Sequence, residues 1–166
     1  NGLRLPYLDA VSISFLSDRQ SAFLEFLKGN LDFISGIDAS YKDELLTRSG
    51  TLRNKYRDRF AMITAPYLNT EYLGFLMTPG SSLSDLRIRK AINYGFDRKQ
   101  MIRFLRNNIG IAGLYGMVPP GLPSSDTTSF TGYHYHPDTT AQLLREAGFP
   151  GGKGLPEMTL STTKEY

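Results

Sequence analysis

The feature that most constrains the fold of this sequence is a long stretch without apolar periodicity, residues 111–135. Apolar side chains there follow neither the 3.6-residue period of a helix nor the two-residue period of a strand. The stretch instead contains Gly, Pro, Ser and Thr around Val118-Pro119-Pro120-Gly121. A loop of this length within one domain usually serves a function or links two parts of a larger architecture. The sequence therefore predicts regular elements on both sides of a functional or connecting loop.

Helices are predicted where apolar residues recur at helical spacing between a capping residue and a stop. Asp18 caps the first of them and Gly29 ends it, while Pro137 begins the last and Gly148 ends it. The predicted helices are residues 19–28, residues 40–46, the segment from the Ser84 cap to Gly95, the segment from the Asp97 cap to the stop at Gly110, and residues 137–147.

Strands are predicted where apolar residues alternate or form short aliphatic and aromatic runs between turn residues. The predicted strands are residues 11–15, 31–34, 60–65, 71–77 and 158–161. Residues 48–59 are basic, contain Gly50, and are predicted to be a mobile surface loop. Together these elements predict an α/β fold with helices flanking a mixed β-sheet.

Composition excludes several classes of protein. The chain has 166 residues, 40% of them hydrophobic and 21% charged, which is typical of one globular domain with a core. It has no cysteine, so disulfide frameworks, thiolate metal sites and cysteine nucleophiles are excluded. No run of 18 apolar residues occurs, so no membrane-spanning helix is predicted.

Catalytic and metal-binding patterns are weak. His134 and His136 stand two residues apart, a spacing that could hold Zn, Ni or Cu, but no further ligand cluster accompanies them and a role as loop histidines beside Pro137 explains them as well. Neither a G-x-S-x-G nor a phosphate-binding G-x-x-x-x-G-K-[ST] motif is present. The residues therefore give no positive evidence for catalysis, and no metal site and no cofactor are predicted.

Two alternative functions stay open from the residues alone. The net charge of +3 is local, because positive residues concentrate in residues 48–59 and 87–106. The second of these segments could be a nucleic-acid footprint, although its positive residues also fit the solvent face of amphipathic helices and no nucleic-acid-binding motif accompanies them. The alternatives are thus a basic nucleic-acid-binding module or an uncharacterised hydrolase domain.

Several aromatic residues stand on predicted strand edges and loops, where flat rings often line a ligand cleft but also often belong to the core. They are Tyr67, Tyr72, Phe75, Tyr115 and Tyr133.

Several motifs in one order resemble the family 5 extracellular solute-binding proteins, which are receptors of peptide, dipeptide and nickel ABC importers. The segment 72–75 reads YLGF, and the segment 84–98 reads SDLRIRKAINYGFDR. Similar matches cover nearly the whole chain: PYLD at 6–9, KGNLDF at 28–33, VPPG at 118–121, YHYHPD at 133–138 and AQLLREAGF at 141–149.

The sequence departs from the family pattern at three places. Leu76 replaces the usual Asn, one residue is added in the turn before Ser84, and His136 replaces the common Asp before Pro137. The first change puts a hydrogen bond of the cleft in doubt, and the last weakens a helix cap.

The resemblance implies a fold and a function. The fold would be part of lobe I of a type II periplasmic-binding-protein fold, with residues 1–150 in the centre of that lobe and residues 151–166 crossing to the second lobe. The function would be that of the substrate-binding component of an ABC importer, which captures oligopeptides or similar small polar ligands for a membrane permease. The protein would be periplasmic or extracytoplasmic. A full-length protein of the lipoprotein type would be held at the membrane by a lipid anchor.

The resemblance also implies ligand-binding residues. Tyr72 and Tyr115, with Met117 beside it, are expected to line the cleft face of this lobe. Because receptors of the family are about three times this length and close two lobes on the ligand, the chain alone is expected to hold only part of the cleft and to bind weakly.

Overall fold

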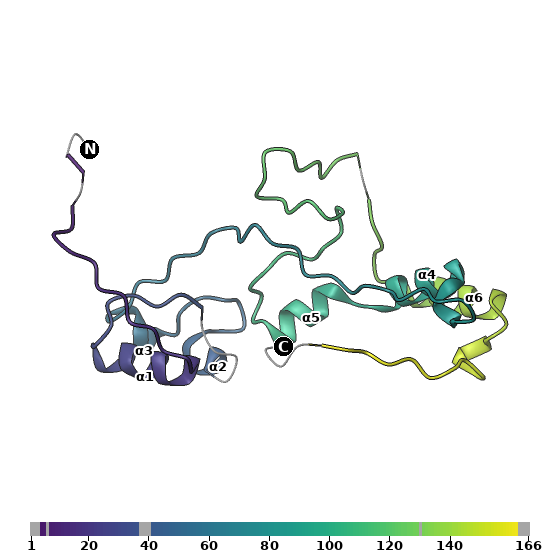
Figure 1. Cartoon of the computed structure of the whole chain (residues 1–166), viewed down its shortest axis with the longest axis horizontal. Coiled ribbons are helices and arrows are strands. Elements are labelled where there is room, and N and C mark those ends of the chain that lie inside the picture. The colour runs from purple at the N-terminus through teal and green to yellow at the C-terminus, as the bar shows by residue number, and fades with distance from the viewer. Residues whose placement is uncertain (1–3, 6, 37–40, 130, 163–166) are drawn as a thin grey trace.

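A computed structural model describes residues 4–5, 7–36, 41–129 and 131–162 of the chain. Within these residues, helices and extended segments follow one another without a central sheet (Figure 1). The elements are α1 (Arg19–Lys28), α2 (Lys42–Leu45), α3 (Asn54–Arg57), the 3₁₀ turn η1 (Ser82–Ser84), α4 (Leu86–Gly95), α5 (Arg98–Leu105), α6 (Pro137–Glu146) and the 3₁₀ turn η2 (Pro150–Gly152).

Helices α1, α2 and α3 form an N-terminal cluster around one small hydrophobic core. The buried side chains are Phe23, Leu45, Leu46 and Tyr56. The Tyr41 ring packs against Phe23 with 4.6 Å between ring centroids, and the Tyr56 hydroxyl donates a hydrogen bond to Glu44. Burial of these apolar side chains, rather than the propensity of such short helices, holds the cluster together.

Helices α4 and α6 form the second packed unit, with Ile88 and Ala91 of α4 buried. They approach closely at Gly95, where an added Cβ would lie 3.3 Å from the Thr140 methyl group. The Thr140 hydroxyl donates a hydrogen bond to the carbonyl of Ala91 at 3.2 Å. A small residue at the end of α4 thus allows α6 to lie against it. In Figure 1, α5 lies between this pair and the N-terminal cluster.

The end of α5 contacts the N-terminal cluster through two asparagines that both have positive φ, 49° at Asn107 and 61° at Asn108. Asn107 is buried; its side-chain amide donates to Asp43, and its oxygen accepts a hydrogen bond from Lys42. The amide of Asn108 donates to the carbonyl of Arg48 at 2.6 Å. Asparagine tolerates the left-handed conformation, and here its polar groups are satisfied in it.

The predicted helices are confirmed with small shifts at their ends. Asp85, rather than Ser84, caps α4, because its carboxylate accepts the backbone N–H of Arg87 at 2.8 Å. Helix α5 ends at Leu105, before the left-handed pair at 107–108 that stops it, and not at Gly110. Within the predicted helix at residues 40–46, α2 covers Lys42–Leu45, and Ser40 lies outside the described residues.

The predicted strands are wrong in the described residues, so the mixed β-sheet is not confirmed. The one β-contact there is an isolated antiparallel bridge between Leu46 and Leu52. Backbone hydrogen bonds join no two of the predicted strands. Alternating residues of the first predicted strand remain exposed, with Phe15 at 94%. Alternation indicates a half-buried surface, but an extended segment becomes a strand only when a neighbour pairs with its backbone.

The prediction that residues 48–59 form a surface loop is wrong in part, because residues 54–57 form α3. Leu52 pairs with Leu46, and α3 buries Tyr56 in the N-terminal core. Three arginines of this segment donate to backbone carbonyls, Arg53 to Leu46, Arg57 to Leu52 and Arg59 to Leu27. Lys55 pairs with the carboxylate of Glu44. The guanidinium groups of this segment therefore satisfy carbonyl oxygens of neighbouring backbone segments.

The aperiodic stretch 111–135 folds back on itself. Near its two ends, the backbone N–H of Gly132 donates to the carbonyl of Leu114 at 2.7 Å. Farther along the loop, the hydroxyl of Thr70 donates to the carbonyl of Met117, and Gly121 lies against Pro66 and Leu68. The loop therefore packs over the extended segment 66–70. No helix of the described residues has the length and apolar character to cross a membrane.

We predict that Phe23→Ala destabilises the N-terminal cluster, because Phe23 is 1% exposed and packs on Tyr41. The expected loss in free energy of unfolding is about 3 kcal/mol by urea denaturation, from lost burial and the cavity left behind. The matched control is Leu24→Ala, the next residue along α1, whose side chain is exposed. An equal loss for both variants would contradict this core.

We predict that Gly121→Ala displaces the loop from segment 66–70, because an added Cβ would lie 2.8 Å from both Pro66 and Leu68. The ring of proline cannot turn aside as a flexible side chain can. Limited proteolysis should cleave residues 116–129 faster in this variant. Gly113→Ala is the control, since open space surrounds Gly113; equal cleavage of both variants would show that the close approach does not hold the loop.

Candidate functional site

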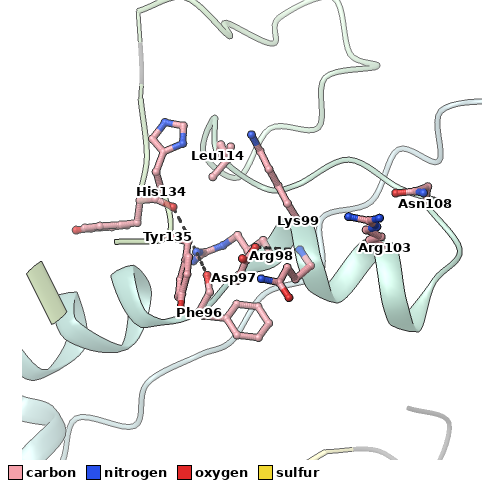
Figure 2. Close-up of a pocket in the computed structure, with 11 residues that line it drawn as sticks. Phe96, Asp97, Arg98, Lys99, Arg103, Asn108, Leu114, His134 and Tyr135 are labelled. Atoms are coloured by element: carbon pink, nitrogen blue, oxygen red, sulfur yellow. Dashed lines mark hydrogen bonds between the residues drawn. The ribbon is translucent and has the colours of Figure 1, made fainter. Parts of the chain in front are cut away.

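Two adjoining hollows lie between α5 and the two ends of the long loop. Their volumes are about 450 and 400 Å³, and they share Lys99, Asn108, Leu114 and His134. Figure 2 shows Lys99 and His134 extending in the same direction on either side of Leu114. The first hollow adds the aromatic residues Phe96, Tyr133 and Tyr135, and the second adds Tyr115. The site therefore combines basic, aromatic and amide groups, which is typical of sites that bind small polar molecules.

Leu114 forms an apolar part of the lining. Its side chain is buried although it stands in the aperiodic loop, and its carbonyl accepts the Gly132 hydrogen bond that closes the loop. Ile102 and Ile111 add further apolar surface to the second hollow. A ligand in this space would meet hydrocarbon beside the polar groups.

Arg98 attaches the wall formed by residues 133–135 to the helices. Its guanidinium donates to the Asn93 side chain at 2.9 Å, to the Asn93 carbonyl at 3.0 Å and to the Tyr133 carbonyl at 3.3 Å. The Tyr94 and Tyr133 rings meet edge to face with their centroids 5.0 Å apart. Beyond them, the N–H of His136 donates to the carbonyl of Tyr94. The start of α6 and the wall of the first hollow are thus fixed to the end of α4.

The cations that line the first hollow are Arg98, Lys99 and Arg103. Arg98 uses its donors on the carbonyls described above. Lys99 and Arg103 stand four residues apart, so they share one face of α5, and both side chains are exposed. Asp97 also lines this hollow, and its carboxylate accepts the backbone N–H of Gln100 at 2.9 Å, which caps α5.

Two carboxylates outside the hollows, those of Asp85 and Asp126, accept hydrogen bonds from residues next to them in the sequence. The guanidinium of Arg87 beside Asp85 lowers the pKa of that carboxyl below its usual value. In the long loop, hydrogen bonds from Ser129 and Thr128 hold the pKa of Asp126 well below its usual range. Both carboxylates therefore stay ionised at neutral pH and are satisfied locally.

The structure brings the three predicted site residues into one region, though not into one hollow. Tyr115 lines the second hollow. Met117 is exposed, and its carbonyl accepts the hydrogen bond from Thr70. Tyr72 is 74% exposed, two residues beyond Thr70, and lines neither hollow.

Sequence reasoning missed Lys99, Arg103, Asn108 and Leu114. The spacing of Lys99 and Arg103 was the available signal, but it fits the solvent face of any amphipathic helix equally well. His134, one half of the two-histidine pattern that could hold a metal, lines both hollows. The partner in that pattern, His136, caps α6: its Nδ1 accepts the backbone N–H of Thr139 at 3.2 Å. Among described residues no group of three or more His, Asp or Glu side chains could hold a metal ion.

Comparison with known proteins decides the family. The model for "Bacterial extracellular solute-binding proteins, family 5 Middle" matches residues 2–166. The chain belongs to this family. Members of family 5 are extracellular binding proteins rather than enzymes, and they act in the periplasm or elsewhere outside the cytoplasm.

The relatives of this chain are named as binding proteins for different solutes or for a transporter. "Heme-binding protein A" of Haemophilus influenzae is 26% identical over 87% of this chain and 24% of its own length. A "Probable ABC transporter-binding protein" of Deinococcus radiodurans is 24% identical over 89% of this chain and 25% of its own length. "Glutathione-binding protein GsiB" of Shigella flexneri is 23% identical, with 89% and 27% covered. The chain thus spans about a quarter of the length of these relatives.

We predict that Arg98→Lys loosens the wall at residues 132–136, because a single ammonium cannot reproduce the several hydrogen bonds of the guanidinium. Hydrogen exchange of the Gly132 and His136 amides should accelerate roughly tenfold, as expected for the loss of one or two hydrogen bonds to a charged group. Arg145→Lys, at an exposed arginine of α6, is the control. Unchanged exchange in Arg98→Lys would mean that other contacts hold this wall.

Proposed function

We propose that this family 5 chain is part of the substrate-binding component of an ABC importer, which captures an oligopeptide or similar small polar solute. The carrying observation is the pair of hollows between α5 and residues 133–135, lined by cations, tyrosines and Asn108. These groups can hold a polar solute by hydrogen bonds and ring contacts, and they include no serine or cysteine nucleophile.

The names of the relatives support capture for transport. One relative is named as a probable ABC transporter-binding protein, and another as a glutathione-binding protein. Glutathione is itself a small peptide, which favours peptides as the solute class. A membrane permease would then receive the solute from the closed receptor, and a lipid anchor would keep the receptor near it.

In this proposal, the chain belongs to lobe I of a type II periplasmic-binding-protein fold. Residues 1–150 form the centre of the lobe, and residues 151–166 lead toward the second lobe. Tyr72, Tyr115 and Met117 lie on the cleft face. The hydrogen bond from Thr70 to Met117 supports this placement, because it keeps the segments before Tyr72 and after Tyr115 together. Closure of two lobes would add the contacts that one lobe lacks.

Nucleic-acid binding has less support. Many of the basic residues in segment 87–106 are engaged within the chain: Arg87 pairs with Asp85, Arg106 pairs with Glu71, and Arg89 donates to the carbonyl of Leu83. Few donors therefore point outward as a continuous phosphate-binding stripe.

We predict that the full-length protein is stabilised by solutes and not by nucleic acid. The probes are a pool of short peptides, glutathione, haem, and duplex DNA and RNA at two salt concentrations, with the melting temperature as readout. A solute at 100 times its Kd should stabilise the protein by about 2.7 kcal/mol. Mass spectrometry of the peptide pool afterwards should find the peptides intact.

A variant pair ties that stabilisation to this chain. Tyr115→Ala should reduce it, whereas Tyr67→Ala, at an exposed tyrosine that lines neither hollow, should not. Stabilisation by DNA or RNA alone, with strong salt dependence, would instead favour the nucleic-acid-binding alternative. Cleaved peptides would favour the hydrolase.

A further inference from the structure

The first hollow has more positive than negative charge. Among the described residues that line it, three are cationic at neutral pH and one, Asp97, is acidic. The Asp97 carboxylate is already turned to the backbone of α5, where it accepts the Gln100 N–H. A neutral solute would leave this charge uncompensated, whereas an anionic group would pair with it.

Lys99 and Arg103 are the cations free to meet such a group. Within the part of the chain that the structure describes, neither makes an ion pair or a side-chain hydrogen bond. Arg103 lies over the Phe104 ring, with its guanidinium carbon 5.4 Å from the ring centroid, and this contact leaves its N–H donors unused. By contrast, Arg106, one turn farther on, is held by Glu71 in a two-pronged pair with distances of 2.6 and 3.0 Å.

The opposite wall has groups that complement an anion on a hydrocarbon stem. His134 lines both hollows and can donate from its ring, and Tyr115 adds a hydroxyl to the second hollow. Leu114, between Lys99 and His134 in Figure 2, offers apolar surface to the carbon chain. Cations of α5 and hydrogen-bonding groups of the loop thus line the same hollows, with the apolar Leu114 between Lys99 and His134.

We infer that these hollows bind a carboxylate of the solute, with Lys99 and His134 as the groups common to both hollows, Arg103 as the second cation in the first hollow and Tyr115 as a hydrogen-bonding neighbour in the second. This inference rests on the proposed solute capture and specifies its substrate class: solutes with a free carboxylate, such as peptides with an unblocked C-terminus or an acidic side chain. An arginine can grip both carboxylate oxygens, and a lysine adds a second charge.

The test uses the 166-residue chain and a matched pair of probes, glutarate and its neutral diamide glutaramide, at constant ionic strength. The chain has two histidines, so the Hε1 region of its NMR spectrum contains two imidazole signals, and His134→Gln assigns them. Glutarate should move the His134 signal saturably. Glutaramide should not move it, and the His136 signal, which reports the cap of α6, should stay in place under both probes.

Charge-removing variants then locate the binding. Lys99→Gln and Arg103→Gln should each weaken glutarate binding about tenfold, the effect of losing one charge-assisted hydrogen bond. Arg145→Gln and Lys153→Gln remove cations that line neither hollow and should change it less than about twofold. Circular dichroism checks that all four variants stay folded. The absence of a saturable shift, an equal response to glutaramide, or equal weakening by the control variants would each overturn the inference.

A second comparison separates this inference from the proposed function. The full-length protein is titrated with tripeptides that end in a free carboxylate and with the same tripeptides as C-terminal amides. If both forms bind equally and glutarate does not bind the chain, solute capture stands and the carboxylate site is wrong. If glutarate binds as expected but peptides, glutathione and haem all fail to stabilise the protein, the carboxylate site stands and the proposed function is wrong.

Discussion

Hydrogen bonds from the Arg98 guanidinium join three segments that are separate in sequence. The side chain starts at the first residue of α5, reaches back to Asn93 near the end of α4 and crosses to the carbonyl of Tyr133. A planar group with five donors suits this position because it can serve several acceptors in one plane. Together with the Tyr94–Tyr133 ring contact and the hydrogen bond from Gly132 to Leu114, this contact keeps the loop end beside α5, where the hollows lie. The buried polar contacts of Asn107 play a corresponding part at the other end of that helix.

The helices could be predicted from the sequence because their signals are local. A capping carboxylate precedes α1, α4 and α5, and a left-handed glycine, Gly29, follows α1. Whether the extended segments pair into a sheet could not be predicted from local patterns, because pairing depends on which segments lie side by side. The exposed side chains of Val11, Ile13 and Phe15 show that alternation alone brings no neighbour. The helical turn at residues 54–57 was missed because its charges obscured Tyr56, the one side chain that it buries.

The candidate site was only partly predictable. Tyr115 was predicted as a cleft residue from the family resemblance, because an aromatic residue in a loop is as often part of the core, and in the structure it lines the second hollow. Lys99 and Arg103 were assigned to a solvated face, since sequence spacing places residues on a helix face but does not say what that face meets. The sequence singled out His134 because it stands two residues before His136. In the structure, His134 lines the hollows, whereas the His136 ring caps α6. Because the chain belongs to a solute-binding family, substitution of these residues can be tested for an effect on solute binding.

The hydrogen bond between Gly132 and Leu114 separates the long loop into a base beside the hollows and an outer part that packs on segment 66–70. Residues that touch the hollows, such as Leu114 and Tyr133, belong to the base, while the proline-rich part lies beyond it. Changing the length of a flexible loop is inexpensive once its ends are held, about 0.6 kcal/mol for each doubling. Insertions and deletions beyond the Gly121 contact, between residues 122 and 129, can therefore accumulate during evolution without moving the groups that line the hollows.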